Sequence, residues 1–401
     1  MSNPFSAGAS AIGYIYQVRY ALYLILMDEN IEKDISIERL DDVAFETNGT
    51  ATELIQLKHH TKKTAALTTG CSDLWKTIRV WSESINSNEI QLPGTILSLI
   101  TTGVAPKDSA AYFMKSDLNR NPEKALDILL SFIGSSKSKS NETNYSAFLS
   151  LCEDKQLALI QAIYIIDSTP NIAEITDLIK KRLSLATRRS TLNALFERVE
   201  GWWLNKIIEH LVDNSIGFVS GFEVQDIIND FSDQLSPDSL PIDYYDENPQ
   251  SLVDVMINDS LLFVEQLRLL NLDNKTIEFA IRDYYRAFIQ RSRWAKDELL
   301  FVSELQKYEI KLLDEWDRQF TRINRSIHKI SDELVLVEKG LEIYDWMSDS
   351  QIYIRKNCTE PYVMRGSYHM LADKPNLCLG WHPKFKERLT KLLEFHQEKS
   401  S

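Results

Sequence analysis

Cysteine, positive charge and long apolar runs are all scarce in this chain of 401 residues. The four cysteines are scattered, which is typical of a reduced compartment and provides no disulfide framework. Lysine and arginine number 45 against 58 acidic residues, and the net charge of −13 argues against binding of nucleic acid through an overall basic surface. Because no apolar run reaches membrane-spanning length and the N-terminus lacks a signal-peptide layout, we expect a cytoplasmic protein without membrane contact.

Two catalytic motifs are also missing. The sequence has no Gly-x-x-x-x-Gly-Lys-Ser/Thr phosphate loop, so an ATPase activity would have to come from a partner. It has no Gly-x-Ser-x-Gly elbow, and no cysteine stands near a convincing histidine and aspartate pair, which disfavours serine or cysteine hydrolase chemistry. Hydrophobic residues make up 44% of the chain and charged residues 26%, as in a soluble globular protein.

Residues 34–60 carry the clearest functional signal. Apolar residues stand at odd positions and polar residues at even positions, and a strand places alternate side chains on opposite faces. The pattern predicts a β-hairpin with a turn at residues 47–50. Leu40 and Asp41 interrupt the alternation, which predicts a bulge and leaves open which aspartate faces the site, with Asp42 preferred. In this register four polar side chains share one face, namely Glu38, Asp42, Gln56 and Lys58.

These groups suit phosphodiester hydrolysis. Mg²⁺ takes oxygen ligands, commonly one or two carboxylates together with waters and substrate phosphate. A bound metal lowers the pKa of its water and holds the reacting oxygens, and a nearby ammonium group can position the attacking water or offset charge on the phosphate. The same residue types are also common on an ordinary exposed hairpin, so the motif alone does not establish a site.

The arrangement of an aspartate, a tight hairpin and Gln-x-Lys resembles the PD-(D/E)XK nuclease superfamily, in the variant in which glutamine replaces the usual acid. The neighbouring motifs GYIYQ, SDLWKT and TILSLITT predict a helix before the hairpin, then a helix and a buried strand after it. Together they resemble the nuclease domain of CBASS-associated and Lamassu-type anti-phage defence effectors, over roughly the first 200 residues. The resemblance implies that Asp42 (or Asp41) and Glu38 ligate Mg²⁺ (or Mn²⁺) and that Gln56 is a further metal ligand or a water-orienting amide. It also implies that Lys58 is the catalytic lysine, with support from Gln17 on the first helix.

Residues 365–383, RGSYHMLADKPNLCLGWHP, are similar to the C-terminal domain of ABC-three-component defence proteins. A nuclease core joined to this domain resembles the Lamassu effector nucleases. That resemblance implies a double-stranded DNA endonuclease that docks onto an SMC-like ATPase and a small accessory subunit. It also implies a homo-oligomer, a dimer or tetramer, in the active state. We expect changes at Tyr368 or Trp381 to impair docking or folding more than chemistry.

We therefore predict an α+β protein. A PD-(D/E)XK restriction-endonuclease-like α/β core with helical additions would occupy residues 1–235. The Pro- and Asp-rich residues 236–250 would form a linker, and residues 251–401 a mainly helical domain for partner binding and oligomerisation. Within this frame Trp202 and Trp203 are expected in a core or domain interface. The aromatic and arginine residues of the predicted helix 274–297 would serve packing, with DNA contact as the alternative.

Three alternatives stay open at this stage. The chain could be a non-catalytic subunit that keeps the nuclease fold for DNA or partner binding, because Gln56 is a weaker metal ligand than an acid and the charge is acidic. The same metal chemistry would also serve cleavage of RNA. Finally, two thiolates and two imidazoles near the C-terminus could form a structural zinc site, although we favour histidines that hydrogen bond within a compact fold; the four residues are Cys358, His369, Cys378 and His382.

Overall fold

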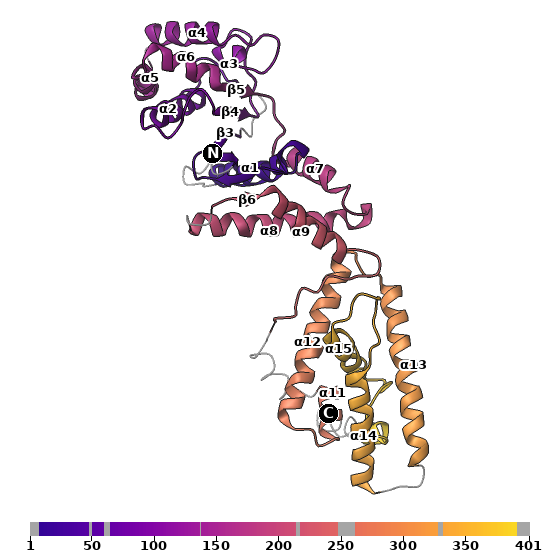
Figure 1. Cartoon of the computed structure of the whole chain (residues 1–401). Helices are drawn as coiled ribbons and strands as arrows, with labels where there is room; N and C mark the ends of the chain where they lie inside the picture. The colour runs from indigo at the N-terminus through magenta and orange to yellow at the C-terminus, as the bar shows by residue number, and fades with distance from the viewer. Residues whose placement is uncertain are drawn as a thin grey trace, which may run out of the picture. The chain divides into compact units, whose positions relative to one another are not determined.

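The computed structural model of the chain describes residues 8–47, 50–59, 65–136, 138–213, 217–247, 261–327 and 332–390 (Figure 1). The chain forms two compact units, Met1–Phe231 and Ser232–Ser401. The first unit contains a mixed sheet with helices, and the named elements of the second are all helices. The predicted α+β class is therefore confirmed.

The sheet of unit 1 has six strands in the order β5-β4-β3-β2-β1-β6. β1 pairs with β2 and β6, and β2 with β3, all antiparallel, whereas β3 pairs with β4 and β4 with β5 in parallel. β3 thus stands between the antiparallel and the parallel halves of the sheet. The strands are β1 (Asp34–Ile37), β2 (Val43–Thr47), β3 (Thr50–Lys58), β4 (Ile96–Thr101), β5 (Ile163–Ile166) and β6 (Val219–Ser220).

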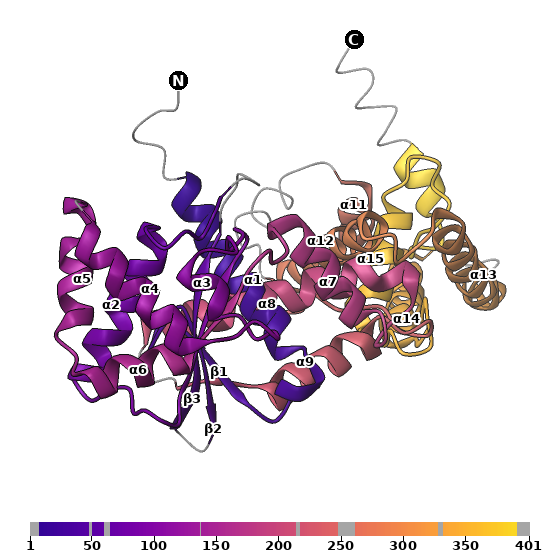
Figure 2. The same cartoon turned by 90° about the horizontal axis from the view of Figure 1, so that it is seen from above.

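Helices cover both faces of this sheet (Figure 2). On one side lie α2 (Ser72–Asn86), α4 (Pro122–Ser135), α5 (Glu142–Leu149) and α6 (Glu153–Ala162). On the other side lie α1 (Gly8–Ile25), α7 (Ile172–Leu183) and α8 (Leu192–Val212). The remaining helices of the unit include α3 (Ala110–Phe113) and α9 (Gly221–Gln234). As expected for a core residue, Trp203 is fully buried and its indole Nε1 donates to the Val18 carbonyl at 2.8 Å.

The predicted alternation of the first three strands is confirmed, but the even-numbered face is not open to solvent. Leu54 and Ala44 lie in one hydrophobic cluster with the α2 residues Trp75 and Ile78, and Gln56 on the same face as Leu54 is only 9% exposed. The reason is that β3 also pairs in parallel with β4, and sheets of this kind are covered on both faces. The face that was expected to carry exposed carboxylates is therefore mostly interior.

The predicted bulge at the aspartate pair is wrong. β1 ends at Ile37 and β2 begins at Val43, so Asp41 and Asp42 lie in the turn between two strands rather than inside one. The Glu38 amide donates to the Asp42 carbonyl at 3.2 Å, which closes this turn. The irregularity in register lies further on, between Phe45 and Glu46, where β2 pairs with β3.

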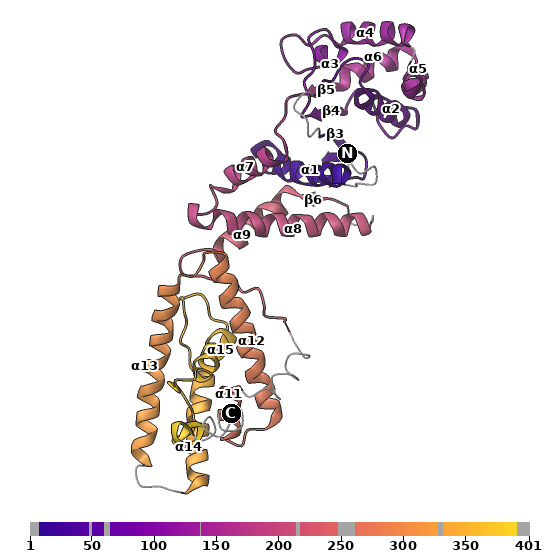
Figure 3. The ribbon, with the colours of Figure 1, turned by 180° about the vertical axis from the view of Figure 1, so that it is seen from behind.

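Unit 2 is built around α15 (Pro361–Ala372), which lies between α12 and α13 (Figure 3). Gly366 allows the close approach of α15 to α12, because a Cβ there would stand 2.1 Å from the Asp283 carbonyl oxygen. Tyr368 and Trp381 are fully buried in the core of this unit. The other helices are α11 (Leu262–Arg268), α12 (Asn274–Lys296), α13 (Val302–Ser326) and α14 (Glu333–Asp349).

The Pro- and Asp-rich stretch predicted as a linker begins inside unit 2. Leu240 is buried, the Pro241 carbonyl accepts from Trp294 Nε1 at 2.7 Å, and the Asp243 amide donates to Gln290 at 2.8 Å. The first residues of the stretch thus pack against α12, whereas residues 248–250 lie outside the described part of the chain. Among the described residues, no helix is both long and apolar enough to cross a membrane.

Candidate active site

Asp42 and Lys58 meet at one end of β3. The Asp42 carboxylate accepts a hydrogen bond from the Leu57 amide through Oδ2 at 2.7 Å, and Lys58 Nζ lies 3.8 Å from the same oxygen. Both side chains are partly exposed, at 13% for Asp42 and 24% for Lys58. The carbonyl of Lys58 accepts from the Thr101 hydroxyl at 3.2 Å, which fixes the end of β3 against β4. The structure therefore joins the two predicted residues into a partly exposed ion pair.

Glu38 completes the negative side of this site. Its backbone has a positive φ of 56°, a conformation that side chains other than glycine rarely adopt. Partial burial of the carboxyl raises the pKa of Glu38, and the charges of Asp42 and Asp41 raise it further, while Lys58 lowers it. Glu38 thus lies within electrostatic range of both aspartates and the lysine, at an otherwise exposed position.

Asp41, by contrast, is a buried hydrogen-bond acceptor. Its Oδ1 accepts from the Asp42 amide at 2.9 Å and from Gln56 Nε2, and its Oδ2 accepts from Trp81 Nε1 at 2.7 Å. The side chain is 8% exposed. Burial raises the pKa of Asp41, and the three hydrogen bonds lower it. Because both oxygens already have partners, Asp41 does not suit the predicted alternative role of metal ligand.

Gln56 is engaged at both ends of its amide. Nε2 donates to Asp41 Oδ1 and lies 3.5 Å from Asp42 Oδ1, while Oε1 accepts from the Thr77 hydroxyl at 3.1 Å. Thr77 is fully buried on α2, one helical turn before Trp81. Gln56 therefore points toward α2 and not toward the solvent side of the site.

Thr77 and Trp81 were missed by sequence reasoning. Both lie on the apolar stripe of α2, and a residue four positions along a helix falls on the same face. The available signals were a threonine among apolar residues and an indole N–H that needs an acceptor. These signals indicate that α2 has a buried polar partner, but they do not identify the partner residue.

The first helix borders the site through its aromatic residues. The Tyr16 ring packs on His59, with ring centroids 4.5 Å apart. Burial and the charge of Glu38 raise the pKa of Tyr14, which places the Tyr14 hydroxyl within electrostatic range of that carboxylate. The predicted supporting residue, Gln17, is half-buried on α1, and among the described residues it shares no hydrogen bond or ion pair with the hairpin residues.

Several basic residues stand near the site in the sequence, and the structure describes only some of them. Lys76 is exposed on α2, and Arg79 pairs with Glu83 at 3.7 Å. His60, Lys62 and Lys63 lie outside the described residues. The described residues therefore establish no basic surface for nucleic acid at this place.

No closed metal centre is preformed in the described part of the chain, where no three histidine, cysteine, aspartate or glutamate side chains group as metal ligands. This argues against the zinc alternative, whose four residues are all described. His382 has a hydrogen-bond partner in place of a metal, because its Nδ1 accepts a hydrogen bond from the Lys384 amide at 3.0 Å. His369 packs among the rings of Phe263, Tyr344 and Trp381, and its Nδ1 has no hydrogen-bond partner among the described residues.

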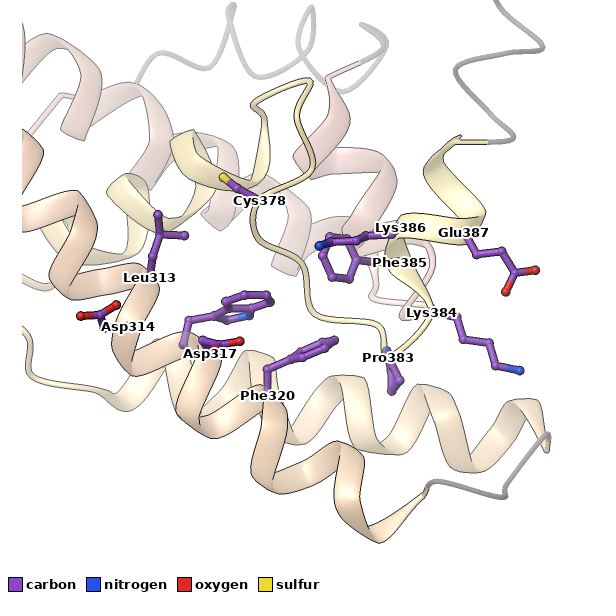
Figure 4. Close-up of a pocket in the computed structure, with 11 residues that line it drawn as sticks. Leu313, Asp314, Asp317, Phe320, Cys378, Pro383, Lys384, Phe385, Lys386 and Glu387 are labelled. Carbon is purple, nitrogen blue, oxygen red and sulfur yellow. The ribbon is translucent and has the colours of Figure 1, made fainter.

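Unit 2 has a hollow of about 660 Å³ (Figure 4). Trp316, Phe320 and Phe385 form an aromatic cluster along it, with the carboxylates of Asp314 and Asp317 beside them. The thiol in its lining belongs to Cys378, where burial raises the pKa and so disfavours a thiolate. No histidine lines the hollow, which suits binding better than nucleophilic catalysis.

Residues 263–389 match the family model for C-terminal domain 7 of the ABC-three component (ABC-3C) systems. The matched residues lie within unit 2, and the match confirms the predicted similarity of this region to the C-terminal domain of ABC-three-component proteins. The match supports the assignment of this chain as a component of an anti-phage defence system. No curated protein matches the chain.

Two solved structures of a Cap4 receptor with a SAVED/CARF domain from Acinetobacter baumannii show weak similarity. The complex with the cyclic trinucleotide 3'3'3'-cAAA is 13% identical over 65% of this chain and 61% of that chain, with a TM-score of 0.33. The complex with 2'3'3'-cAAA is 14% identical over 65% and 58%, with a TM-score of 0.32. The chain thus matches about three-fifths of the receptor's length, and similarity at this level carries no conclusion about fold or activity.

Proposed function

We propose that this chain is a metal-dependent double-stranded DNA endonuclease, the effector of a Lamassu-like anti-phage defence complex. The observation that carries the proposal is the 3.8 Å pairing of Asp42, in the turn between β1 and β2, with Lys58 at the end of β3. Both side chains are partly open to solvent. An acid and an amine held this way can act together on a phosphodiester, the acid on a metal and the amine on the phosphate. The match of unit 2 to an ABC-three component domain supports the defence context.

The residues that fit a divalent metal are Asp42 and Glu38. Apart from the long 3.5 Å contact with Gln56, Asp42 Oδ1 has no hydrogen bond in the described structure, and the charge of Asp42 helps to raise the pKa of Glu38. A cation would relieve this repulsion, and two carboxylates with waters and substrate phosphate form an ordinary Mg²⁺ or Mn²⁺ site. When bound, the metal would supply Lewis-acid activation of water and phosphate.

The chain's own residues then have separate tasks. Asp42 would bind the metal while its Oδ2 stays fixed by the Leu57 amide. Lys58 would hold a phosphate oxygen or the attacking water, and its distance of 3.8 Å from Asp42 leaves its ammonium free to approach substrate. Because the Leu57 amide holds the Asp42 carboxylate beside the end of β3 that carries Lys58, the site would need little rearrangement before it binds DNA.

The partners follow from the same proposal. We expect unit 2 to contact an SMC-like ATPase and a small accessory subunit, and we expect self-association, a dimer or tetramer, because a double-strand break usually needs two sites. Tyr368 and Trp381 are fully buried, so they would support such contacts only by maintaining the fold of unit 2. Co-purification with the neighbouring operon products and light scattering of the purified chain measure these two expectations.

A second candidate is a subunit that binds DNA or a partner without cutting. It is favoured by the engagement of Gln56 and Asp41 in internal hydrogen bonds, which leaves fewer groups for a metal than a nuclease of this type usually has. An RNA-directed nuclease would use the same residues as the leading candidate. Competition between DNA and RNA substrates separates that possibility.

We expect Asp42→Asn to lower Mg²⁺-dependent plasmid cleavage by about 10²-fold or more, since it removes the charge that binds the metal and keeps the shape of the side chain. Cleavage is measured with Mg²⁺ and with EDTA, for the chain alone and with its operon partners. Asp127→Asn, an exposed change on α4, is the matched control and should cut normally. Absence of metal-dependent cutting by the unaltered chain under all these conditions would instead support the non-catalytic subunit.

A further inference from the structure

The buried hydrogen bonds behind the proposed site form one continuous network. Trp81 donates to one oxygen of Asp41, and Gln56 and the Asp42 amide both donate to the other. Thr77 in turn donates to the Gln56 carbonyl oxygen at 3.1 Å. Each side chain of the network is at most 9% exposed, so no solvent competes for these bonds.

We infer that Gln56, Thr77 and Trp81 are positioning residues that hold the Asp42 carboxylate, and that Gln56 is not a metal ligand. This inference rests on the proposed function of Asp42 and Lys58. It assigns roles to two α2 residues outside the hairpin, and it reverses the role that the Gln-x-Lys pattern implies for Gln56.

The hydrogen bond between Gln56 and Asp41 explains why residue 56 is an amide. Gln56 Nε2 lies within hydrogen-bonding distance of Asp41 Oδ1, and a carboxylate can only accept, so a glutamate there would set two acceptors against each other. In a buried position, two carboxylates of like charge cannot both ionise without a large penalty. A neutral donor is therefore required at this place as long as Asp41 is buried beside it.

The route from the network to the site passes through the turn between β1 and β2. Asp41 accepts from the backbone amide of Asp42, and the Asp42 carbonyl accepts from the Glu38 amide at 3.2 Å. The direction of the Asp42 side chain is thereby fixed from its own backbone. Thr77 determines which end of the Gln56 amide faces Asp41, because its hydroxyl donates to the oxygen end.

The test compares Trp81→Phe with Trp75→Phe. Both variants remove a buried indole donor from α2, but Trp75 donates to the Thr69 carbonyl at 2.6 Å and does not touch Asp41. We expect Trp81→Phe to lower kcat about tenfold with little change in KM for DNA. A loss in kcat without a matching change in KM is expected because Trp81 contacts Asp41 and not the DNA. Equal kcat and KM values for the two variants would overturn the inference.

Gln56→Glu and Thr77→Val complete the test, with Mn²⁺ binding as a readout that does not require cleavage. If Gln56 positions Asp42, Gln56→Glu binds Mn²⁺ no more tightly than the unaltered chain. It also melts at a lower temperature, because two buried acceptors then face each other. A Gln56→Glu chain that folds and binds Mn²⁺ several-fold more tightly would identify a ligand and overturn the inference.

Thr77→Val keeps the inference falsifiable if the charged variant does not fold. It should weaken Mn²⁺ binding severalfold, whereas the control Ser82→Ala should not. Ser82 is a buried residue on α2 whose hydroxyl, among the described residues, donates to the Ile78 carbonyl alone. Equal binding by these two variants counts against the network. A chain that binds Mn²⁺ in this pattern without cutting DNA would contradict the nuclease proposal and leave the positioning roles supported.

Discussion

Lys58→Ala is expected to lower DNA cleavage by about 10²- to 10³-fold, the loss seen when one group that stabilises transition-state charge is removed. The physical reason is the position of the ammonium group, 3.8 Å from Asp42 Oδ2 and 24% exposed, where it can reach a phosphate that Asp42 helps to hold. The thermal midpoint should hardly change. A partly exposed ion pair of this kind contributes about 0–1 kcal/mol to stability.

The measurement is single-turnover cleavage of a supercoiled plasmid, with circular dichroism to check the fold. Lys155→Ala removes an exposed lysine from α6 and should cut as the unaltered chain does. Lys58→Arg retains the charge but changes its shape, so partial activity is expected, because a guanidinium and an ammonium group are not interchangeable. Full activity of Lys58→Ala would remove the lysine from the mechanism.

Trp381→Ala is expected to destabilise unit 2 by about 3–5 kcal/mol, the usual cost of truncating a buried aromatic residue. Trp381 is fully buried, and its ring contacts those of Tyr344 and His369, with centroids 5.6 and 5.5 Å away. The cavity left by the missing indole ring would remain unfilled, because the surrounding helices are closely packed. Co-purification with partner subunits should fall in parallel, since it depends on a folded unit 2.

Urea unfolding of the full chain measures the first effect, and Trp381→Phe provides the comparison. The Trp381 indole nitrogen has no hydrogen-bond partner among the described residues, so phenylalanine removes volume alone and should cost less than alanine. Phe279→Ala, at a 48% exposed position on α12, should change stability by less than about 1 kcal/mol. Equal stabilities of Trp381→Ala and Phe279→Ala would contradict the observed packing.

The hairpin strands were predictable because their pattern is local. The alternation around Ile35 and Ile55 determines which side chains are buried together, and both residues are in the core. What surrounds the even-numbered face was not predictable, because it depends on α2, which approaches from a later part of the chain. Gln56 is buried for that reason, and the open face expected for it was wrong. Asp42, in the turn before β2, and Lys58, at the end of β3, remain partly exposed.

The choice between the two aspartates shows the same limit. Adjacent residues in a turn have no alternation to distinguish them, and only the position of Trp81 and Gln56 shows that Asp41 is buried. In unit 2 the similarity of residues 365–383 to a known domain was informative, since the family match includes them. The histidines of this stretch were expected in a compact fold, and both His369 and His382 are buried. The aromatic rings around His369 were not predictable, because Phe263 and Tyr344 come from other helices.

The backbone of Glu38 implies a trade-off between stability and function. A side chain in the left-handed region costs about 1–2 kcal/mol relative to glycine, yet this position carries a glutamate with φ of 56°. Glu38→Gly should therefore be more stable than Glu38→Ala, which keeps the strain, and thermal unfolding of the pair measures the difference. Both should lose metal-dependent cleavage. A stabilising glycine that abolishes activity would mean that the fold tolerates a strained turn in order to hold a carboxylate where the metal is expected to bind.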